Sequence, residues 1–244
     1  MRLMLRSTVV LMALAAPVWA EQPKLGPNAV AITDDHAFLR QAPAPDFWAF
    51  APFVKPQVTP TACTVAALAA AVNGLRGLPA SAEEPVLTQQ ALLEAVGDPE
   101  WIAMTAPDGT GVPFDALARF AAASLRAAGL ARYEAEAVRL SGPDDLDRLR
   151  TILRTNEASA DDAVVVAYNQ GVVTGDWFGG HVALIGAYDG EADRVLILEV
   201  DQEWYIPYWT PVAVLAQAIV TPVADPDSPF PGEVGGLIHL RPQD

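Results

Sequence analysis

The sequence has little cysteine, since Cys63 is the only one among 244 residues. Exported chains usually hold their cysteines in disulfide pairs, which a single cysteine cannot form within one chain. The paired-cysteine zinc and redox sites are excluded as well, and no Cys/His cluster has the spacing of metal ligands. We therefore expect no cofactor and no metal held by the protein. A lone thiol is either a small buried hydrophobe or a reactive group, and the count alone favours neither.

Positive charge is also scarce. The chain has 15 Lys and Arg against 30 Asp and Glu, which gives a formal net charge of -15. Such a surface repels the phosphate backbone of nucleic acids, so nucleic acid is an improbable partner. It disfavours anionic membrane surfaces for the same reason.

Long hydrophobic runs are absent beyond the N-terminus, and even there the run 9–16 is too short to cross a bilayer comfortably. Arg2 and Arg6 precede this run, and Val18-Trp19-Ala20 follows it as a small-residue cleavage signal. This three-part pattern predicts a signal peptide over 1–20. The mature protein is then exported and has no membrane-spanning segment. An uncleaved anchor is the alternative interpretation.

Residues 21–244 have the composition of one globular domain, with 52% hydrophobic residues in the whole chain. Residues 21–60 are rich in proline and predict an extended N-terminal segment. After it, helical patterns come first and strand patterns follow. We predict helices over 63–72, 88–96, 113–130, 143–154 and 211–220. We predict strands over 133–140, 163–168, 181–188, 195–200 and 237–240, and a loop over 171–180. The order indicates an α+β domain with a helical half, an antiparallel-sheet half and a possible cleft between them.

Cys63 stands at the start of the first predicted helix, which is rich in alanine and preceded by Pro60. Unpaired N–H groups at a helix N-terminus stabilise an anion, and a thiolate held there is a competent nucleophile. This placement favours a reactive thiol over a buried one.

A cysteine nucleophile needs a proton acceptor, for which histidine is best suited near neutral pH. The chain has three histidines. His36 falls in the irregular N-terminal segment, where we expect it to be exposed, and His239 falls inside the last strand, where packing or surface exposure explains it. His181 follows Gly179-Gly180 and opens a buried strand, so it is the candidate base. A purely structural strand histidine is the alternative for His181.

A carboxylate usually orients such an imidazole. Glu199 ends the apolar run 195–198, where a carboxylate needs a partner. Asp201 lies two residues further, on the same face of a strand, and is the second candidate.

Two blocks of the sequence resemble the phytochelatin synthase family. Gln57-Val58-Thr59-Pro60-Thr61-Ala62-Cys63, followed by a small-residue helix that reaches Asn73, is similar to the family's active-site segment. Gly180-His181, Gly186-Ala187-Tyr188, Leu196-Ile197-Leu198-Glu199-Val200, Tyr205, Pro207 and Trp209 are similar to its second block. The blocks occur in the family's order.

The resemblance implies a papain-like cysteine protease fold and a Cys-His-Asp triad. It makes Cys63 the nucleophile and His181 the base and acid, and it places Glu199 where the family has Asp. Gln57 matches the family's oxyanion-hole glutamine. Gly180 and Tyr205 fall in the matched block and are expected to contact the substrate.

Three departures accompany the resemblance. Gln202 stands where the family has an Arg suited to a substrate carboxylate, and Thr64 replaces a glycine. The Cys-rich C-terminal region of the plant enzymes is missing. The chain is thus similar to the short bacterial members, which mostly cleave glutathione, and a periplasmic location follows.

The function implied is cleavage of the Cys-Gly bond of glutathione through a Cys63 thioester. Glycine is released, and γ-glutamylcysteine or phytochelatin is formed. Heavy metals would then act as thiolate complexes of the substrate. The alternatives are a papain-like peptidase or amidase acting on another exported peptide, and a non-catalytic binding module on a degenerate papain-like scaffold. The oligomeric state is not predicted.

Overall fold

The computed structural model describes residues 24–81, 83, 85–142 and 145–243, and the predicted signal peptide lies outside them. In these residues the strands form one seven-stranded sheet in the order β1-β6-β5-β4-β3-β7-β2. Every pairing in it is antiparallel. The strands are β1 (Val30–Ala31), β2 (Tyr133–Val138), β3 (Ala163–Asn169), β4 (Gly180–Asp189), β5 (Arg194–Leu198), β6 (Tyr208–Pro211) and β7 (Gly236–Pro242).

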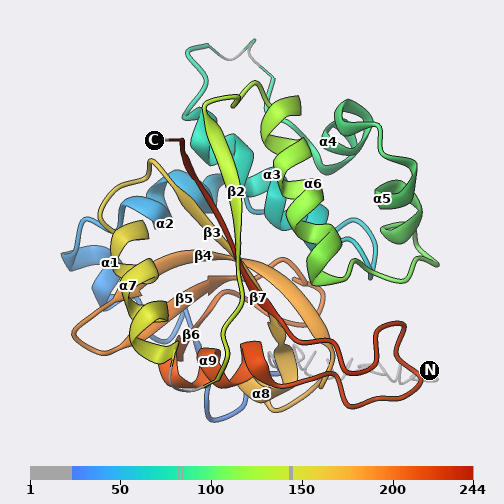
Figure 1. Ribbon diagram of the computed structural model, residues 1–244. Helices are drawn as coiled ribbons and strands as arrows, with labels where there is room; N and C mark the ends of the chain where they lie inside the picture. The colour runs from blue at the N-terminus through green and yellow to red at the C-terminus, as the bar shows by residue number, and fades with distance from the viewer. Residues whose placement is uncertain (1–23, 82, 84, 143–144, 244) are drawn as a thin grey trace, which may run out of the picture.

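Helices lie on both faces of the sheet (Figure 1). They are α1 (Ala37–Gln41), α2 (Pro45–Phe50), the 3-10 turn η1 (Ala51–Phe53), α3 (Cys63–Arg76), α4 (Gln89–Val96), α5 (Pro99–Met104), α6 (Phe114–Ala127), α7 (Leu146–Asn156), α8 (Gln170–Thr174) and α9 (Val212–Val220). The helices α1 to α6 precede most of the strands, as the predicted α+β order requires, although the short β1 comes before them and α7, α8 and α9 lie among the later strands.

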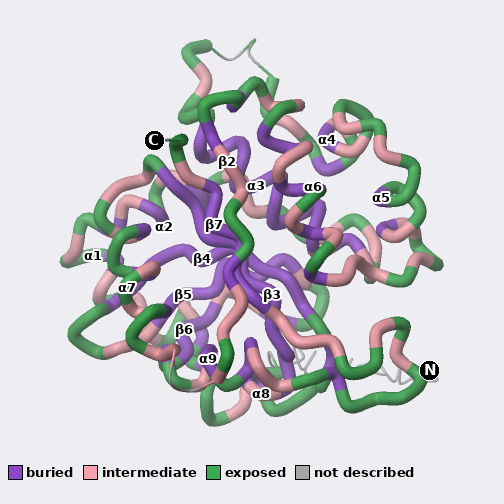
Figure 2. The backbone as a smooth tube through the Cα atoms, in the orientation of Figure 1, coloured by how far each residue is buried: buried purple, intermediate pink, exposed green. Residues whose placement is uncertain are grey.

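The central strands are buried on both faces, as Figure 2 shows by their purple colour. Val182 and Leu184 of β4 pack into a core with α3 and α6, whereas Ala183 and Ile185 pack into a second core with α7 and α9. Alternate side chains of a strand point to opposite faces, so a strand between two helical layers reads as a continuous apolar run. This explains why 163–168 and 195–198 lack the alternation of a half-exposed strand.

Helix α3 is buried from Thr64 to Leu75. A helix packed on every side needs small residues, because large ones would hold its neighbours apart. Gly74 gives the sharpest case, since a Cβ there would lie 2.0 Å from Cδ1 of Phe50. The alanine-rich sequence after Cys63 therefore fixes this helix in the centre of its core and fixes the position of its N-terminus.

Several elements differ from the sequence predictions. The prolines of 21–60 predict an extended segment, but the described part of it contains α1 and α2. Pro45 is the first residue of α2, where the missing N–H costs nothing, so this proline starts a helix. The predicted loop 171–180 begins within α8. Helix α5 and strand β6 were not predicted.

One buried carboxyl group has no ion-pair partner among the described residues. Asp46 of α2 is fully buried, and Asn156 Nδ2 donates a hydrogen bond to its Oδ2, while Oδ1 has no partner among the described residues. Burial, reinforced by the negative charges of Glu157 and Asp162, raises the pKa of Asp46 to about 10. The folded protein therefore keeps this carboxyl neutral at neutral pH.

We expect Asp46→Asn to stabilise the protein at neutral pH. The unfolded chain ionises Asp46 above its usual pKa of 3.8, whereas the folded chain does so only near 10, so the wild type loses stability as pH rises between these values. Asparagine has the same shape and no such loss, and we expect a gain of about 1–3 kcal/mol at about pH 7. Urea unfolding at about pH 7 and pH 4 measures it. A gain that does not shrink at the lower pH would contradict the account.

Candidate active site

Cys63 is the first residue of α3, and its side chain is half-buried. Its backbone N–H belongs to the first turn, whose N–H groups have no acceptor within the helix. Ala62 at the N-cap position makes no side-chain hydrogen bond to that turn. The positive end of the helix thus remains available to an anion formed at or beside the Cys63 sulfur.

His181 and Glu199 form a buried pair at the neighbouring ends of β4 and β5. His181 Nε2 lies 2.7 Å from Glu199 Oε1, and the side chains are 4% and 0% exposed. The β4–β5 register pairs Leu184 with Leu198, so Glu199 falls opposite Ala183, one diagonal step from His181. The antiparallel hairpin therefore brings together two residues that are 18 positions apart.

Hydrogen-bond donors surround the Glu199 carboxylate. The backbone N–H groups of Val200 and Asp201 each donate to Oε1 at 2.7 Å, and Gln170 Nε2 donates to Oε2 at 3.1 Å. Burial alone would raise the pKa of Glu199, but the imidazolium of His181 and the backbone N–H groups of Asp201 and Val200 lower it overall. The carboxylate is thus held ionised inside the protein.

The contact with Glu199 also raises the pKa of His181. Burial opposes its charge, but the Glu199 carboxylate and a hydrogen bond with the Cys63 side chain outweigh it and raise the pKa of His181 to about 10. Because Nε2 is bound to Glu199, Nδ1 is the atom left to face Cys63. The three side chains form a chain of contacts from a fixed carboxylate through an imidazole to a thiol, which is an arrangement suited to nucleophilic catalysis.

Asp201, the second candidate for the carboxylate, has no recorded hydrogen bond to His181. It is half-buried, and burial together with the nearby carboxylates of Glu199 and Glu203 raises its pKa, although His181 opposes this. Asp201 lines a cavity beside Cys63. The geometry therefore gives the orienting contact to Glu199.

Gln57 lies against the same end of β5, where its backbone N–H donates to Val200 O at 2.8 Å. Its Nε2 donates to Pro60 O at 3.3 Å, and its buried Oε1 has no partner among the described residues. An amide nitrogen carries two hydrogens, so one remains for another acceptor. Gln57, Cys63 and His181 line one cavity together.

Two cavities meet at Cys63. The first has a volume of about 290 Å³ and the second about 340 Å³. Pro60, Cys63, Trp177, Gly180 and His181 line both. The Cys63 side chain thus lies where the two cavities meet, and a molecule bound beside it can occupy both.

Gly180 and Tyr205 lie where the resemblance implies contact with a substrate. A Cβ on Gly180 would meet only Val223, at an ordinary 3.7 Å, so packing does not require glycine there. By contrast, a Cβ on Gly179 would lie 2.0 Å from the Trp177 ring, so Gly179 makes room for this tryptophan. Tyr205 is buried, and its hydroxyl donates to Asp176 Oδ2 at 3.0 Å in the wall of the second cavity.

Gln170 is a residue of this site that the sequence patterns did not reveal. It is fully buried at the start of α8, and through its bond to Glu199 Oε2 it acts on the imidazole as a positioning residue. A signal was present, because Asn169 and Gln170 form a polar pair directly after an apolar run of strand type. Buried polar groups at such a point need partners.

The other two histidines stand apart from Cys63. His239 is buried in β7, where its Nε2 pairs with Asp162 Oδ2, so packing accounts for it as predicted. His36 is only partly exposed, because it occupies the N-cap position of α1.

Within the described ranges, no group of three or more His, Cys, Asp or Glu side chains is arranged to hold a metal ion. None of the helices in those ranges has the length and apolar content needed to cross a membrane.

A family model described as phytochelatin synthase matches residues 25–229, which is most of the chain. The matched range contains Gln57, Cys63, His181 and Glu199 and ends before β7. No curated protein matches the sequence.

Proposed function

Because the chain belongs to the phytochelatin synthase family, we propose that it has a papain-like fold and cleaves the Cys-Gly bond of glutathione through a thioester on Cys63. The contact chain from Glu199 through His181 to Cys63 carries this proposal. It supplies a nucleophile, a proton carrier and a fixed counter-charge at the point where two cavities meet.

In the first step, a thiolate at Cys63 attacks the carbonyl carbon of the cysteinyl-glycine amide. The oxygen gains negative charge, which the free amide hydrogen of Gln57 and the N–H of Cys63 are placed to stabilise. The carbon–nitrogen bond then breaks, and the His181 imidazolium gives its proton to the departing glycine amine. The product is a γ-glutamylcysteinyl thioester with a neutral His181.

In the second step, water attacks the thioester carbonyl while His181 takes its proton. The carbon–sulfur bond breaks, γ-glutamylcysteine leaves, and the thiolate–imidazolium pair is restored. A second glutathione could replace water and give phytochelatin. The second cavity opposes this route, because Asp201 and Glu203 line it without an ion-pair partner among the described residues and would repel a second anionic glutathione. We therefore propose that hydrolysis predominates.

We propose that Lys24 replaces the arginine that the family has at the position of Gln202. Gln202 Nε2 donates a hydrogen bond to the backbone oxygen of Glu199 at 2.9 Å, so Gln202 helps to hold the backbone of Glu199 in place. Lys24 is the only Lys or Arg among the described residues that line the two cavities. Its Nζ lies 3.6 Å from Asp176 and 4.5 Å from the centre of the Trp204 ring. We propose that it binds a carboxylate of the substrate.

Incubation of the mature protein with reduced glutathione tests the proposed reaction. We expect glycine and γ-glutamylcysteine in equal amounts, with little phytochelatin. Protein alkylated beforehand with iodoacetamide is the control, since Cys63 is the only thiol. The absence of glycine with glutathione, together with release of amines from casein, would contradict it in favour of a peptidase. Release of neither would favour a binding module.

A further inference from the structure

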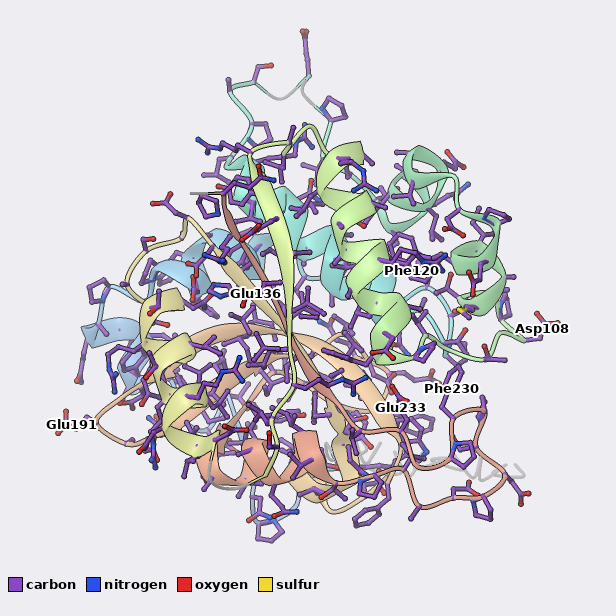
Figure 3. All side chains as sticks on the ribbon, viewed as in Figure 1. Asp108, Phe120, Glu136, Glu191, Phe230 and Glu233 are labelled. Carbon is purple, nitrogen blue, oxygen red and sulfur yellow. The ribbon has the colours of Figure 1, made fainter. Side chains whose placement is uncertain are left out.

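The first cavity is apolar over most of its wall. It lies between the loop before α6 and the long loop before β7, which contribute Val112, Phe114, Val223, Phe230 and Val234. Figure 3 shows Phe230 and Glu233 on the second loop, across from the loop that carries Asp108. A pocket of this size and lining excludes water from an aliphatic or aromatic group and so favours its binding.

The charged side chains in this wall are already engaged. Among the described residues that line this cavity, Glu233 is the only carboxylate, and there is no Lys or Arg. Its Oε1 accepts the backbone N–H of Phe114 at 3.0 Å and lies 4.0 Å from Arg139. Glu233 therefore caps the start of α6 through this oxygen.

One polar group in the wall has no partner. Asn169 is 3% exposed, and its Nδ2 donates to Pro222 O at 3.3 Å, while its Oδ1 has no partner among the described residues. Because this oxygen is also shielded from solvent, it offers no contact to a ligand in the cavity. The feature that the cavity presents to a ligand is therefore its apolar wall.

Aromatic side chains extend this surface at the opening. Trp177 lines both cavities and is 53% exposed, and the neighbouring Phe178 is 56% exposed. Large exposed aromatics beside a reactive thiol commonly mark a ligand surface.

Glutathione leaves this cavity poorly filled. Its side groups are a charged γ-glutamyl unit, a small thiol and the hydrogen of glycine, and none is a bulky apolar group. We propose that the first cavity holds a bulky apolar side chain of a short peptide substrate that Cys63 cleaves. This inference rests on the proposed function, because it takes Cys63 as the nucleophile that the peptide acylates.

A positional scan of glutathione tests the inference and identifies the residue concerned. Three peptides replace the γ-glutamyl, cysteinyl or glycyl residue by phenylalanine, and three matched peptides carry alanine at the same position. At one position we expect kcat/KM for the phenylalanine peptide to exceed that for the alanine peptide by about tenfold or more, because apolar pockets discriminate by such factors. Ratios below about threefold at every position would overturn the inference.

Two variants tie the preference to this cavity. Val112→Phe fills the cavity and Phe230→Ala removes part of its wall, and each is expected to lower the phenylalanine-to-alanine ratio by about fivefold or more. Val86→Phe, at an exposed valine outside both cavities, is the matched control and should leave the ratio unchanged. Ratios that stay at the wild-type value in both cavity variants would overturn the assignment. The readout is a ratio within one protein sample, so partial loss of folded protein does not affect it.

Failure of this inference and failure of the proposed function give different results. If glutathione and all six peptides are cleaved with similar kcat/KM, the apolar cavity does not select the substrate, but the thioester mechanism stands. If no peptide acylates Cys63 and glutathione does not either, both are wrong.

Discussion

Replacing Cys63 by alanine is expected to abolish the release of glycine from glutathione. The sulfur of Cys63 forms the bond that carries the acyl group, and no other thiol exists in the chain to replace it. Removal of the nucleophile from such a unit usually leaves only a small residual rate, and we expect a loss of about a thousandfold or more. The initial rate of glycine formation measures it.

The folded structure should survive this change. Alanine is a good helix former and is smaller than cysteine, so it fits the first position of α3. Circular dichroism and the thermal midpoint of the variant provide the control. Thr64, the next residue, accepts a hydrogen bond from Trp101 Nε1 at 3.1 Å, so Thr64→Ala tests helix packing without removing the sulfur. Undiminished glycine release by purified Cys63→Ala would contradict the mechanism.

The Glu199→Gln variant is expected to have the second largest effect. Glutamine keeps the shape of the side chain but removes the negative charge that offsets the cost of burying the His181 imidazolium. The pKa of His181 then falls, because burial disfavours the charged imidazolium. A smaller fraction of His181 is then protonated at the working pH, and the leaving amine needs that proton. We expect kcat/KM to fall by about a hundredfold or more, as is usual when the orienting acid of a triad is lost.

The pH profile separates this effect from general damage. In the wild type, activity should fall as pH rises through about 10, where His181 loses its proton. In Glu199→Gln the same fall should occur at least about one pH unit lower. Glu199→Asp, which restores the charge, should recover part of the activity. Asp201→Asn neutralises the adjacent carboxylate, so a larger loss there than in Glu199→Gln would contradict the assignment of Glu199.

The same pair links folding stability to pH. His181 has a pKa raised from 6.5 to about 10 in the folded protein, so its stabilising contribution is complete below 6.5 and is lost as pH rises through about 10. Glu199 has a lowered pKa, so its contribution is present above its usual value of 4.5 and is lost on acidification.

The parts of the fold that the sequence predicts are those governed by local patterns. The apolar run after Cys63 predicts α3, and Thr88 predicts the start of α4, where its side chain accepts the N–H of Ala91. The N-terminal segment was wrongly predicted to be extended, because proline within a coil and proline at the start of a helix look alike in sequence. The two cases are distinguished only by tertiary packing, here the packing of Phe50, the last residue of α2, against Gly74 of α3.

The candidate site likewise contains residues that local sequence patterns predict and residues that they do not. The pairing of His181 with Glu199 follows from two adjacent strands and could be anticipated from spacing. The polar pair Asn169-Gln170 after an apolar run signals buried polar groups, but their contacts depend on tertiary packing, and no pattern indicates that Lys24 reaches the site. The difference in chemistry between the two cavities likewise depends on loops that meet only in the folded chain.

Intact-mass measurement of the protein after brief exposure to glutathione, with acid quenching, tests the central claim most directly. The account predicts an adduct on Cys63 with the mass of glutathione less glycine, which resists reductant and is released by hydroxylamine, as a thioester requires. An adduct of the whole glutathione molecule that reductant removes, with no deglycylated adduct at any time, would show a mixed disulfide. That result would contradict Cys63 as the acyl-accepting nucleophile.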